Sequence, residues 1–491
     1  MNNRLIACIL LFAVLAGCGA PSEKEAPQDS PVSLEGFNVV VILIDSLRAD
    51  HLGAYGRPGP TSPFIDTLAS DAVVFGEAHA PSSFTRESVS ALFTGKLPSQ
   101  SGATGWAARP SGPRLGPIFR EAGYATGFFS ESVVVKGPAY TEGFDDFEFF
   151  DLTNADREHA PRLSERALEF AKKHAADPFL MYVHYLDPHG EYYPPAEYAA
   201  RFVDQPPEVP LTLYESGEGV INVRAHRNAL VARGFAPGQK DFEDWRGTYE
   251  AEIAYVDDAV RMLVEGLEAL GVLDRTLLVV TSDHGEEFLE HGYVEHAWTV
   301  YRESTHVPLL LHVPRALSPA RIDARISTVR ILPTLLSLAG LETPAGLPRP
   351  LIEEAGGKVE AISEPGPVIS ENHIEFRNSS VALRDGDWTY IAWFREIPPE
   401  SRHTALRIDG EKIAAGAPFP IGATPVREEL FNTASDPDEQ RDIAAAQPDA
   451  LERMRGLLEA YREACRGAAE GAPPEGADDA AREALETLGY L

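Results

Sequence analysis

Two apolar segments that lie far apart in the chain each end on acidic or imidazole side chains. Residues 38–44 read Asn-Val-Val-Val-Ile-Leu-Ile and are followed by Asp45, and residues 277–282 read Leu-Leu-Val-Val-Thr-Ser and lead to Asp283 and His284. Short apolar runs of this kind are typical of strands buried in a parallel sheet. Open parallel sheets bind ligands at the carboxyl ends of their strands. The pattern therefore favours an α/β fold and predicts a divalent metal site at that edge.

Helix-like and strand-like patterns alternate along most of the chain. Residues 248–270 form the clearest helical pattern, because their apolar side chains recur on one face and Gly271 follows as a stop signal. Further helices are expected over residues 61–71, 87–93 and 163–176, and strands over residues 125–129, 179–185 and 276–281. This alternation predicts the fold class α/β, with a large mostly parallel sheet sandwiched by helices.

The C-terminal third has a different pattern. A stretch rich in Gly and Pro over residues 344–367 indicates a boundary. Residues 368–391 and 428–432 read as antiparallel strands, and residues 448–467 as a helix. We therefore expect a smaller C-terminal α+β subdomain over residues 346–467. An acidic flexible tail with a short terminal helix over residues 468–491 and a loop insertion over residues 205–239 complete the expected organisation.

The first residues resemble a bacterial lipoprotein signal. Arg4 gives a basic start, residues 5–16 are apolar but too short for an ordinary spanning helix, and Leu-Ala-Gly leads to Cys18. By this resemblance residues 1–17 are a signal peptide, Cys18 is lipidated, and residues 18–36 are a flexible tether. An ordinary secretory signal is the alternative. We expect a location in the cell envelope, lipid-anchored to a membrane and facing the periplasm or exterior.

The net charge argues against some classes of binding partner, and the cysteine content argues against a disulfide. The 491 residues carry a formal net charge of −32, which argues against binding nucleic acid or anionic lipid through a basic face. Cys8 belongs to the predicted signal peptide, so Cys465 is left without a second cysteine besides Cys18. No structural disulfide is predicted.

A third segment supplies a candidate nucleophile. Residues 84–95 read as a polar turn that enters a helix, where a hydroxyl could meet both a metal ion and the N–H groups of the helix start. The segment is therefore a candidate nucleophile site. The alternative is an ordinary helix N-cap, a frequent use of threonine. For Asp45 and Asp283 the alternative is a carboxylate that caps the next helix.

Five segments in a fixed order resemble the sulfatase family of the alkaline phosphatase superfamily. They are residues 42–56, 85–95, 182–189, 281–287 and 331–340, and the resemblance continues weakly to residues 439–441. This resemblance implies a sulfatase-like catalytic domain over residues 37–345. It also implies a metal-dependent hydrolase or transferase of sulfuric or phosphoric esters.

The chain also departs from that family. Sulfatases make their nucleophile, a formylglycine, from a cysteine or serine in a C/S-x-P-x-R segment, and Thr85 stands at that place and cannot be converted. Glu87 and Val89 replace the proline and the arginine, and Ser46 stands where most members have a second aspartate. His284 stands where many have asparagine. The resemblance is therefore to a threonine-nucleophile variant, and phosphate esters are expected to be favoured.

The resemblance also suggests roles for the remaining polar residues. Asp45, Thr85, Asp283 and His284 form the expected metal shell, in which an imidazole favours zinc or manganese while calcium stays possible. His189 and His296 are expected to bind the substrate and to act as acids or oxygen-contacting groups. Arg86 is expected to contact substrate anions, although an exposed arginine at a helix start is the simpler interpretation. Arg48, Asp50 and His51 are expected to form an ion-paired turn, and Glu286, Glu287 and His291 to support the site or face solvent.

The expected substrate is an anionic ester, either a sulfo- or phospho-glycan, a lipid headgroup or a small molecule. A catalytically silent protein that binds an anionic glycan or lipid headgroup is the alternative function. A stoichiometric divalent ion in the purified protein would favour the enzyme.

Overall fold

A computed structural model of the chain describes residues 34–105, 110, 112–150, 159–190, 192–204, 236–355, 358–362, 366–374, 378–396 and 422–469. The predicted signal peptide, the tether up to residue 33, residues 205–235 of the predicted insertion and the tail beyond residue 469 lie outside these residues. None of the helices within the described ranges has both the length and the apolar character needed to cross a lipid bilayer.

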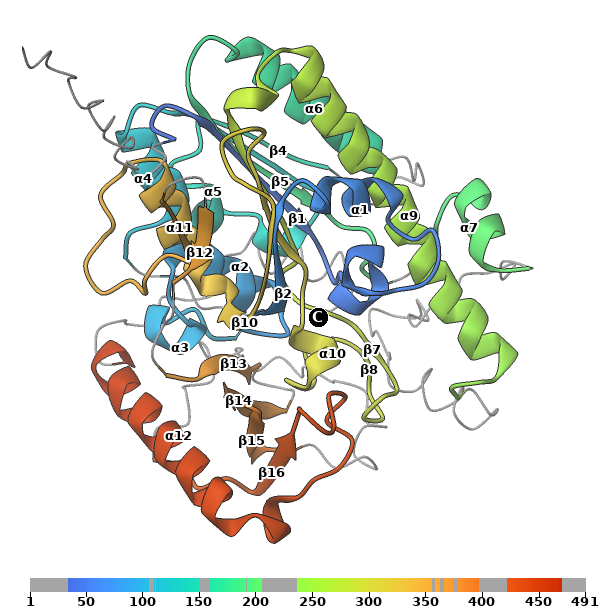
Figure 1. The fold of residues 1–491 in the computed structure, drawn as a ribbon, viewed down its shortest axis with the longest axis vertical. Coiled ribbons are helices and arrows are strands. Elements are labelled where there is room, and N and C mark those ends of the chain that lie inside the picture. The colour runs from blue at the N-terminus through green and yellow to red at the C-terminus, as the bar shows by residue number, and fades with distance from the viewer. Residues whose placement is uncertain are drawn as a thin grey trace, which may run out of the picture.

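The larger part of the molecule is built on one mixed sheet, which has eight strands within the described residues (Figure 1). In spatial order these strands are β10 (Ala320–Ser327), β2 (Val73–His79), β9 (Leu309–His312), β6 (Thr276–Thr281), β1 (Asn38–Ile44), β5 (Phe179–Tyr185), β3 (Ala125–Ser130) and β4 (Asp146–Phe149). β9 runs antiparallel to β2 and β6, and the other described neighbours pair in parallel. The predicted mostly parallel sheet is confirmed.

Helices cover both faces of this sheet, which explains why its strands are apolar at nearly every position. Successive side chains of a strand point to opposite faces. Along β1, Val40, Ile42 and Ile44 join one core cluster, and Val39, Val41 and Leu43 join the other. The first cluster includes residues of α1 (Pro63–Ala69), α6 (His159–Lys173) and α9 (Lys240–Ala269), and the second residues of α2 (Thr85–Thr94), α4 (Leu115–Glu121) and α11 (Ile331–Leu338).

The strand predictions over residues 125–129, 179–185 and 276–281 match β3, β5 and β6 closely, because those segments are mostly apolar. The predicted start of the long helix at residue 248 is wrong. The helix α9 begins at Lys240, and the buried side chains of Phe242 and Trp245 extend its apolar face toward the N-terminus. Charged residues around these two aromatic side chains hid that extension in the sequence.

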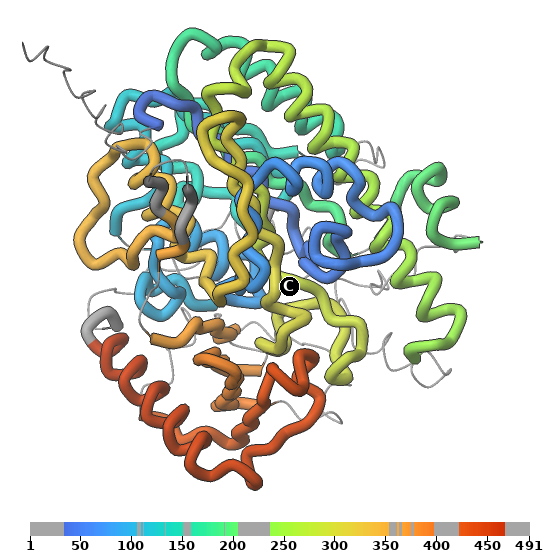
Figure 2. Tube along the Cα trace, in the orientation of Figure 1, coloured from blue at the N-terminus to red at the C-terminus, as the bar shows by residue number. Residues whose placement is uncertain are grey.

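A four-stranded antiparallel sheet lies beside the main sheet, within the described residues near the C-terminus. Its strands are β13 (Val368–His373), β14 (Ser379–Asp385), β15 (Trp388–Arg395) and β16 (Arg427–Asn432), and the helix α12 (Pro448–Ala469) packs against it. The trace in Figure 2 shows this red and orange part at one end of the molecule, on the side of the main sheet opposite to α6. The expected C-terminal α+β unit is confirmed.

Short elements fill the connections. They are the helices α3 (Pro98–Ser101), α5 (Pro138–Thr141), α7 (Ala196–Phe202) and α10 (Arg302–Thr305), and the strands β7 (Glu287–Phe288), β8 (Val294–Glu295), β11 (Ile352–Ala355) and β12 (Lys358–Ala361).

The C-terminal sheet supports the segment that connects β2 to α2. The backbone N–H of Glu371 donates to the carbonyl of Pro81 at 2.8 Å, and the Ser370 hydroxyl donates to the carbonyl of Ala80 at 2.7 Å. Since α2 begins with Thr85, these contacts help to hold the start of that helix in place.

Candidate active site

Three polar side chains meet at the carboxyl ends of the central strands. Asp45 follows β1, His184 is the penultimate residue of β5, and Asp283 lies two residues beyond β6. Leu43 of β1 pairs with His184 on one side and with Thr281 on the other. Because side chains alternate along a strand, Asp45, His184 and Asp283 all extend toward the face covered by α2.

The Asp283 carboxylate has one satisfied and one unsatisfied oxygen. Its Oδ1 accepts the backbone N–H groups of Ser46 at 3.2 Å and His284 at 3.0 Å. Its Oδ2 is buried and has no hydrogen-bond partner among the described residues, although it lies 3.4 Å from Nε2 of His284. A buried carboxylate oxygen without a donor is costly unless a cation balances it. The orphaned oxygen therefore fits a divalent cation.

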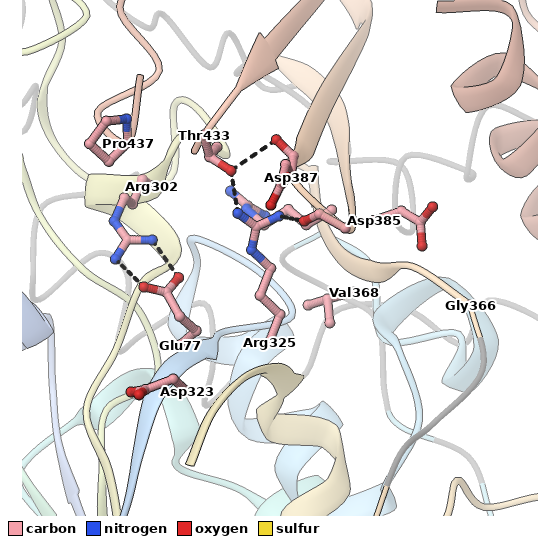
Figure 3. A pocket seen from close by; sticks show the side chains of 12 residues that line it. Glu77, Arg302, Asp323, Arg325, Gly366, Val368, Asp385, Asp387, Thr433 and Pro437 are labelled. Atoms are coloured by element: carbon pink, nitrogen blue, oxygen red, sulfur yellow. Dashed lines mark hydrogen bonds and ion pairs between the residues drawn. The ribbon is translucent and has the colours of Figure 1, made fainter. Parts of the chain in front are cut away.

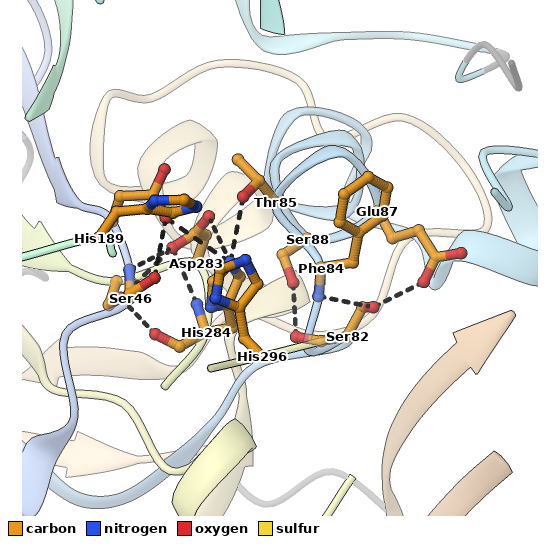
Figure 4. A network of polar contacts seen from close by, with 12 residues as sticks. Ser46, Ser82, Phe84, Thr85, Glu87, Ser88, His189, Asp283, His284 and His296 are labelled. Carbon is orange, nitrogen blue, oxygen red and sulfur yellow. Dashed lines mark hydrogen bonds and ion pairs between the residues drawn. The ribbon is translucent and has the colours of Figure 1, made fainter. Parts of the chain in front are cut away.

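His284 presents one defined nitrogen to this cluster. Its Nδ1 lies 2.9 Å from the carbonyl oxygen of Gly285, which can only accept, so Nδ1 carries a proton. Its Nε2 lies 3.1 Å from Oγ1 of Thr85 (Figure 4). The same nitrogen lies 3.6 Å from Oδ1 of Asp45 and is placed where a metal ligand would be needed.

Thr85 enters the site at the start of α2. Phe84 occupies the cap position and Thr85 is the first helical residue, so the N-cap alternative for Thr85 is wrong. The hydroxyl faces His284, and the positive end of the helix lies beside it. The buried Glu87 carboxyl accepts the Ser82 hydroxyl at 2.6 Å and the Gly105 N–H at 2.9 Å, which supports the turn before the helix. Burial raises the pKa of Glu87 to about 7.

The electrostatics of the cluster also fit a cation. Burial and the nearby charge of Asp283 raise the pKa of Asp45 to about 7, while His189 and His284 oppose that rise. Burial lowers the pKa of His184 to about 4, which keeps its imidazole neutral. Two buried carboxylates this close repel each other when both are ionised. A divalent ion would offset that repulsion, so Asp45, Asp283, His284 and Thr85 fit the expected metal shell.

Two further histidines line the same site. The ring of His296 stacks on that of His284 with centroids 4.3 Å apart, and the ring of His189 lies 4.7 Å from that of His296. Nδ1 of His296 lies 3.2 Å from the buried Glu286 carboxyl, and Nδ1 of His189 lies 2.6 Å from the carbonyl of Gly190. The structure therefore brings both predicted histidines beside the predicted metal ligands (Figure 4).

Arg86, the residue after Thr85, packs against Tyr140. Its side chain is buried, with the guanidinium carbon 5.6 Å from the centre of the Tyr140 ring, so the interpretation as an exposed arginine is wrong. Within the described part of the chain, Arg86 has no hydrogen bond or ion pair to Asp45, Asp283 or His284, and its Nε and Nη1 have no hydrogen-bond partner. Its contact with substrate anions stays a prediction.

The neighbouring polar residues are structural. Arg48 forms an ion pair with Asp50 at 2.7 Å, as expected for the turn after the first strand. Glu286 and Glu287 are buried, so the alternative that they face solvent is wrong. His291 forms an ion pair with Glu303 at 2.6 Å, and this carboxylate raises the pKa of the imidazole to about 9 despite burial.

His184 is a residue of this cluster that was not predicted from the sequence. It is fully buried, and its Nε2 lies 3.1 Å from Oδ2 of Asp45. A signal was present, because His184 is the one ionisable imidazole in a segment that otherwise reads Phe-Leu-Met-Tyr-Val and Tyr. A titratable side chain in such a strand needs a partner.

A pocket of about 480 Å³ lies elsewhere, between the edge of the main sheet and the C-terminal sheet. Among the residues that line it, Arg302 forms an ion pair with Glu77 and Arg325 donates a hydrogen bond to Thr433, as Figure 3 shows. None of the predicted site residues lines it.

Comparison with known proteins points to one family. The family model described as Sulfatase matches residues 37–341, more than half of the chain. The sulfatase YidJ of Escherichia coli is 25% identical over 386 residues, which cover 70% of this chain and 74% of YidJ. The ulvan-active sulfatase of Formosa agariphila is 27% identical over 398 residues, which cover 74% of this chain and 71% of that protein.

Solved structures share the fold. The phosphonate monoester hydrolase of Silicibacter pomeroyi superposes with a TM-score of 0.65 at 18% identity, covering 87% of this chain and 95% of that one. At this identity the likeness concerns the fold alone.

Gly285 holds the Asp283–His284 turn against the segment of Glu303 and Ser304. The N–H of Gly285 donates to the carbonyl of Ser304 at 2.9 Å, and a Cβ added to Gly285 would lie 2.0 Å from the carbonyl oxygen of Glu303. We predict that Gly285→Ala displaces the Asp283–His284 turn, lowers stability by about 1–3 kcal/mol and weakens metal binding. Thermal unfolding and metal titration measure both effects.

Gly456→Ala in α12 is the matched control, because nothing lies within 4 Å of the added Cβ. This control is expected to keep the wild-type melting temperature or exceed it, since alanine favours helix. Wild-type metal affinity in Gly285→Ala would contradict the prediction.

Proposed function

This chain belongs to the sulfatase family and is an ester hydrolase, and we propose that it uses a divalent metal ion and Thr85 as its nucleophile. One observation carries the proposal. The Thr85 hydroxyl lies 3.1 Å from Nε2 of His284, which lies 3.4 Å from an Asp283 oxygen that has no hydrogen-bond partner among the described residues. A hydroxyl held beside candidate metal ligands at a helix start is suited to activation as an alkoxide.

The proposed metal ligands are Asp45, Thr85, Asp283 and His284. When bound, the ion would lower the pKa of the Thr85 hydroxyl and neutralise charge on the ester oxygens. The imidazole of His284 favours zinc or manganese over calcium, since calcium prefers oxygen ligands. Calcium stays possible.

In the proposed reaction, the Thr85 hydroxyl loses its proton to solvent, and Oγ1 attacks the phosphorus or sulfur centre. The new Oγ1–P or Oγ1–S bond forms as the bond to the leaving oxygen breaks. His296 or His189 delivers a proton to that leaving oxygen. Water then hydrolyses the threonine ester, or an acceptor alcohol captures the transferred group. His189, His296 and Arg86 are the proposed contacts for the remaining ester oxygens.

The proposed substrates are anionic esters outside the cytoplasm. The relative from Formosa agariphila is an ulvan-active sulfatase, which supports a glycan as the substrate class. A phospho- or sulfo-glycan, a lipid headgroup and a small ester all remain candidates within this proposal.

Thr85→Ala tests the nucleophile. We expect turnover to fall by about three orders of magnitude or more, while most of the bound metal stays on the other ligands. Asp45→Ala and Asp283→Ala are expected to lose both the metal and the activity. Metal content and steady-state kinetics of the three variants give the comparison.

Thr94→Ala is the matched control, because Thr94 is also a buried threonine of α2 and its hydroxyl donates to the carbonyl of Ser90. It is expected to keep turnover within a few-fold of wild type. A folded Thr85→Ala protein with wild-type turnover would refute the nucleophile. A wild-type protein that binds ligand but turns over no ester would favour the silent binding protein.

Substrate preference is a separate prediction. A threonine ester lacks the second hydroxyl by which a formylglycine hydrate expels sulfate, so phosphate mono- or diesters should be turned over faster than sulfate esters. A matched panel of p-nitrophenyl esters, assayed with zinc, manganese and calcium, measures the ratio. A fastest rate with p-nitrophenyl sulfate would reverse the predicted preference.

We also propose that Cys18 is lipidated and anchors the protein to a membrane of the cell envelope, on its periplasmic or outer side. The support is the sequence Leu-Ala-Gly-Cys after an apolar stretch. Cys18→Ala should block lipidation and signal removal, which leaves a longer precursor in the membrane fraction. Mass spectrometry of the mature wild-type N-terminus would contradict this prediction if it began at a residue other than Cys18.

A further inference from the structure

His184 is the unassigned titratable side chain in the centre of the site. Its ring nitrogen and one carboxylate oxygen each of Asp45 and Asp283 lie within 4.8 Å of one another, and all three residues are buried. We propose that His184 is itself a metal ligand, which joins Asp45, Asp283, His284 and the Thr85 hydroxyl and gives the shell two carboxylates and two imidazoles. This inference rests on the proposed function and names a ligand that it lacks.

The distances between these atoms support a shared ion. Nε2 of His184 lies 3.1 Å from Oδ2 of Asp45. Nε2 of His284 lies 3.6 Å from Oδ1 of Asp45 and 3.4 Å from Oδ2 of Asp283. Zinc bonds to nitrogen and oxygen ligands are about 2.0–2.2 Å long, so two ligand atoms that share one ion lie no more than about 4.4 Å apart. All three contacts are within this limit.

The other nitrogen of His184 has the partner that a ligating histidine needs. Nδ1 lies 3.0 Å from the hydroxyl of Tyr182, which is fully buried and belongs to the same strand. Ligating histidines nearly always hydrogen-bond through their second nitrogen, which fixes the ring orientation. With Nδ1–H donating to Tyr182, Nε2 presents its lone pair to the cluster.

A hydrogen-bonding role is the competing explanation. In that role Nε2–H donates to Asp45 and Nδ1 accepts from Tyr182. Donation by a neutral imidazole leaves the charge of both buried carboxylates in place and gives Asp283 Oδ2 no donor. A cation bound near that oxygen and Asp45 would be repelled by the Nε2 proton of His184. Release of this proton on metal binding removes the repulsion and lets Nε2 bind the cation.

The position of His184 adds a further argument. It lies in the middle of the main sheet, where β5 is paired with β1 on one side and β3 on the other. Its backbone therefore cannot move it away when an ion binds. Two nitrogen and two carboxylate ligands make a set that suits zinc better than calcium.

X-ray absorption at the zinc edge tests this inference on the full-length protein loaded with Zn²⁺. Imidazole ligands give a distinct multiple-scattering signal, so their number can be counted. We expect two imidazoles in wild type and one in His184→Gln, whose Zn²⁺ dissociation constant should rise about a hundredfold or more. Tyr182→Phe should keep two imidazoles and lose about tenfold to a hundredfold in affinity.

His312→Gln is the matched control, because His312 is another buried histidine in a strand of the main sheet. It should keep two imidazoles and the wild-type affinity. One imidazole in wild type would overturn the role of His184 and leave the Thr85 chemistry intact. A wild-type protein that binds no Zn²⁺, Mn²⁺ or Ca²⁺ would overturn this inference together with the proposed metal-dependent function. The wild-type count needs no variant, so a poorly folded His184→Gln protein does not prevent a decision.

Discussion

The burial of Asp45 and Asp283 side by side is the constraint on which the rest of the site depends. Both carboxylates lie at the carboxyl edge of a fully covered sheet, where water cannot solvate them. Their mutual repulsion and burial raise the pKa of Asp45 to about 7. An arrangement of this kind persists only if other groups offset its cost. The backbone N–H groups of Ser46 and His284 offset part of it at Asp283 Oδ1, and the remaining oxygen is suited to a cation.

The hydroxyl that faces this cluster is held from two directions. On one side, the buried Glu87 carboxyl joins Ser82 to Gly105 and fixes the turn before α2. On the other, Ser370 and Glu371 of the C-terminal sheet bond to the carbonyls of Ala80 and Pro81. The C-terminal sheet therefore contributes to the site without supplying a ligand. Glu87 stands where the resemblance expects proline, and its contacts give a structural reason for that departure.

The sulfatase fold is thus combined with a different set of reactive groups. By the resemblance, Thr85, which cannot become formylglycine, stands at the nucleophile position, and His284 stands where many members have asparagine. The proposals for Thr85 and His184 belong together, because a more strongly polarising ion suits a hydroxyl that has no second oxygen to assist it. The ring of His296, which is the proposed proton donor, stacks on that of His284 beside the same residues.

The sequence by itself determined the α/β class and most strand positions. It also selected Asp45, Thr85, Asp283 and His284 as candidate site residues. Apolar runs that end on polar residues are a local signal, and the family resemblance supplied Thr85. The sequence did not determine which strands are neighbours. Only the order β6-β1-β5 brings His184 beside Asp45, because parallel pairing sets Leu43 opposite both His184 and Thr281. The tertiary structure also decided that Arg86 packs against Tyr140 and that α9 begins at Lys240. Both depend on burial by distant segments, which no local pattern records.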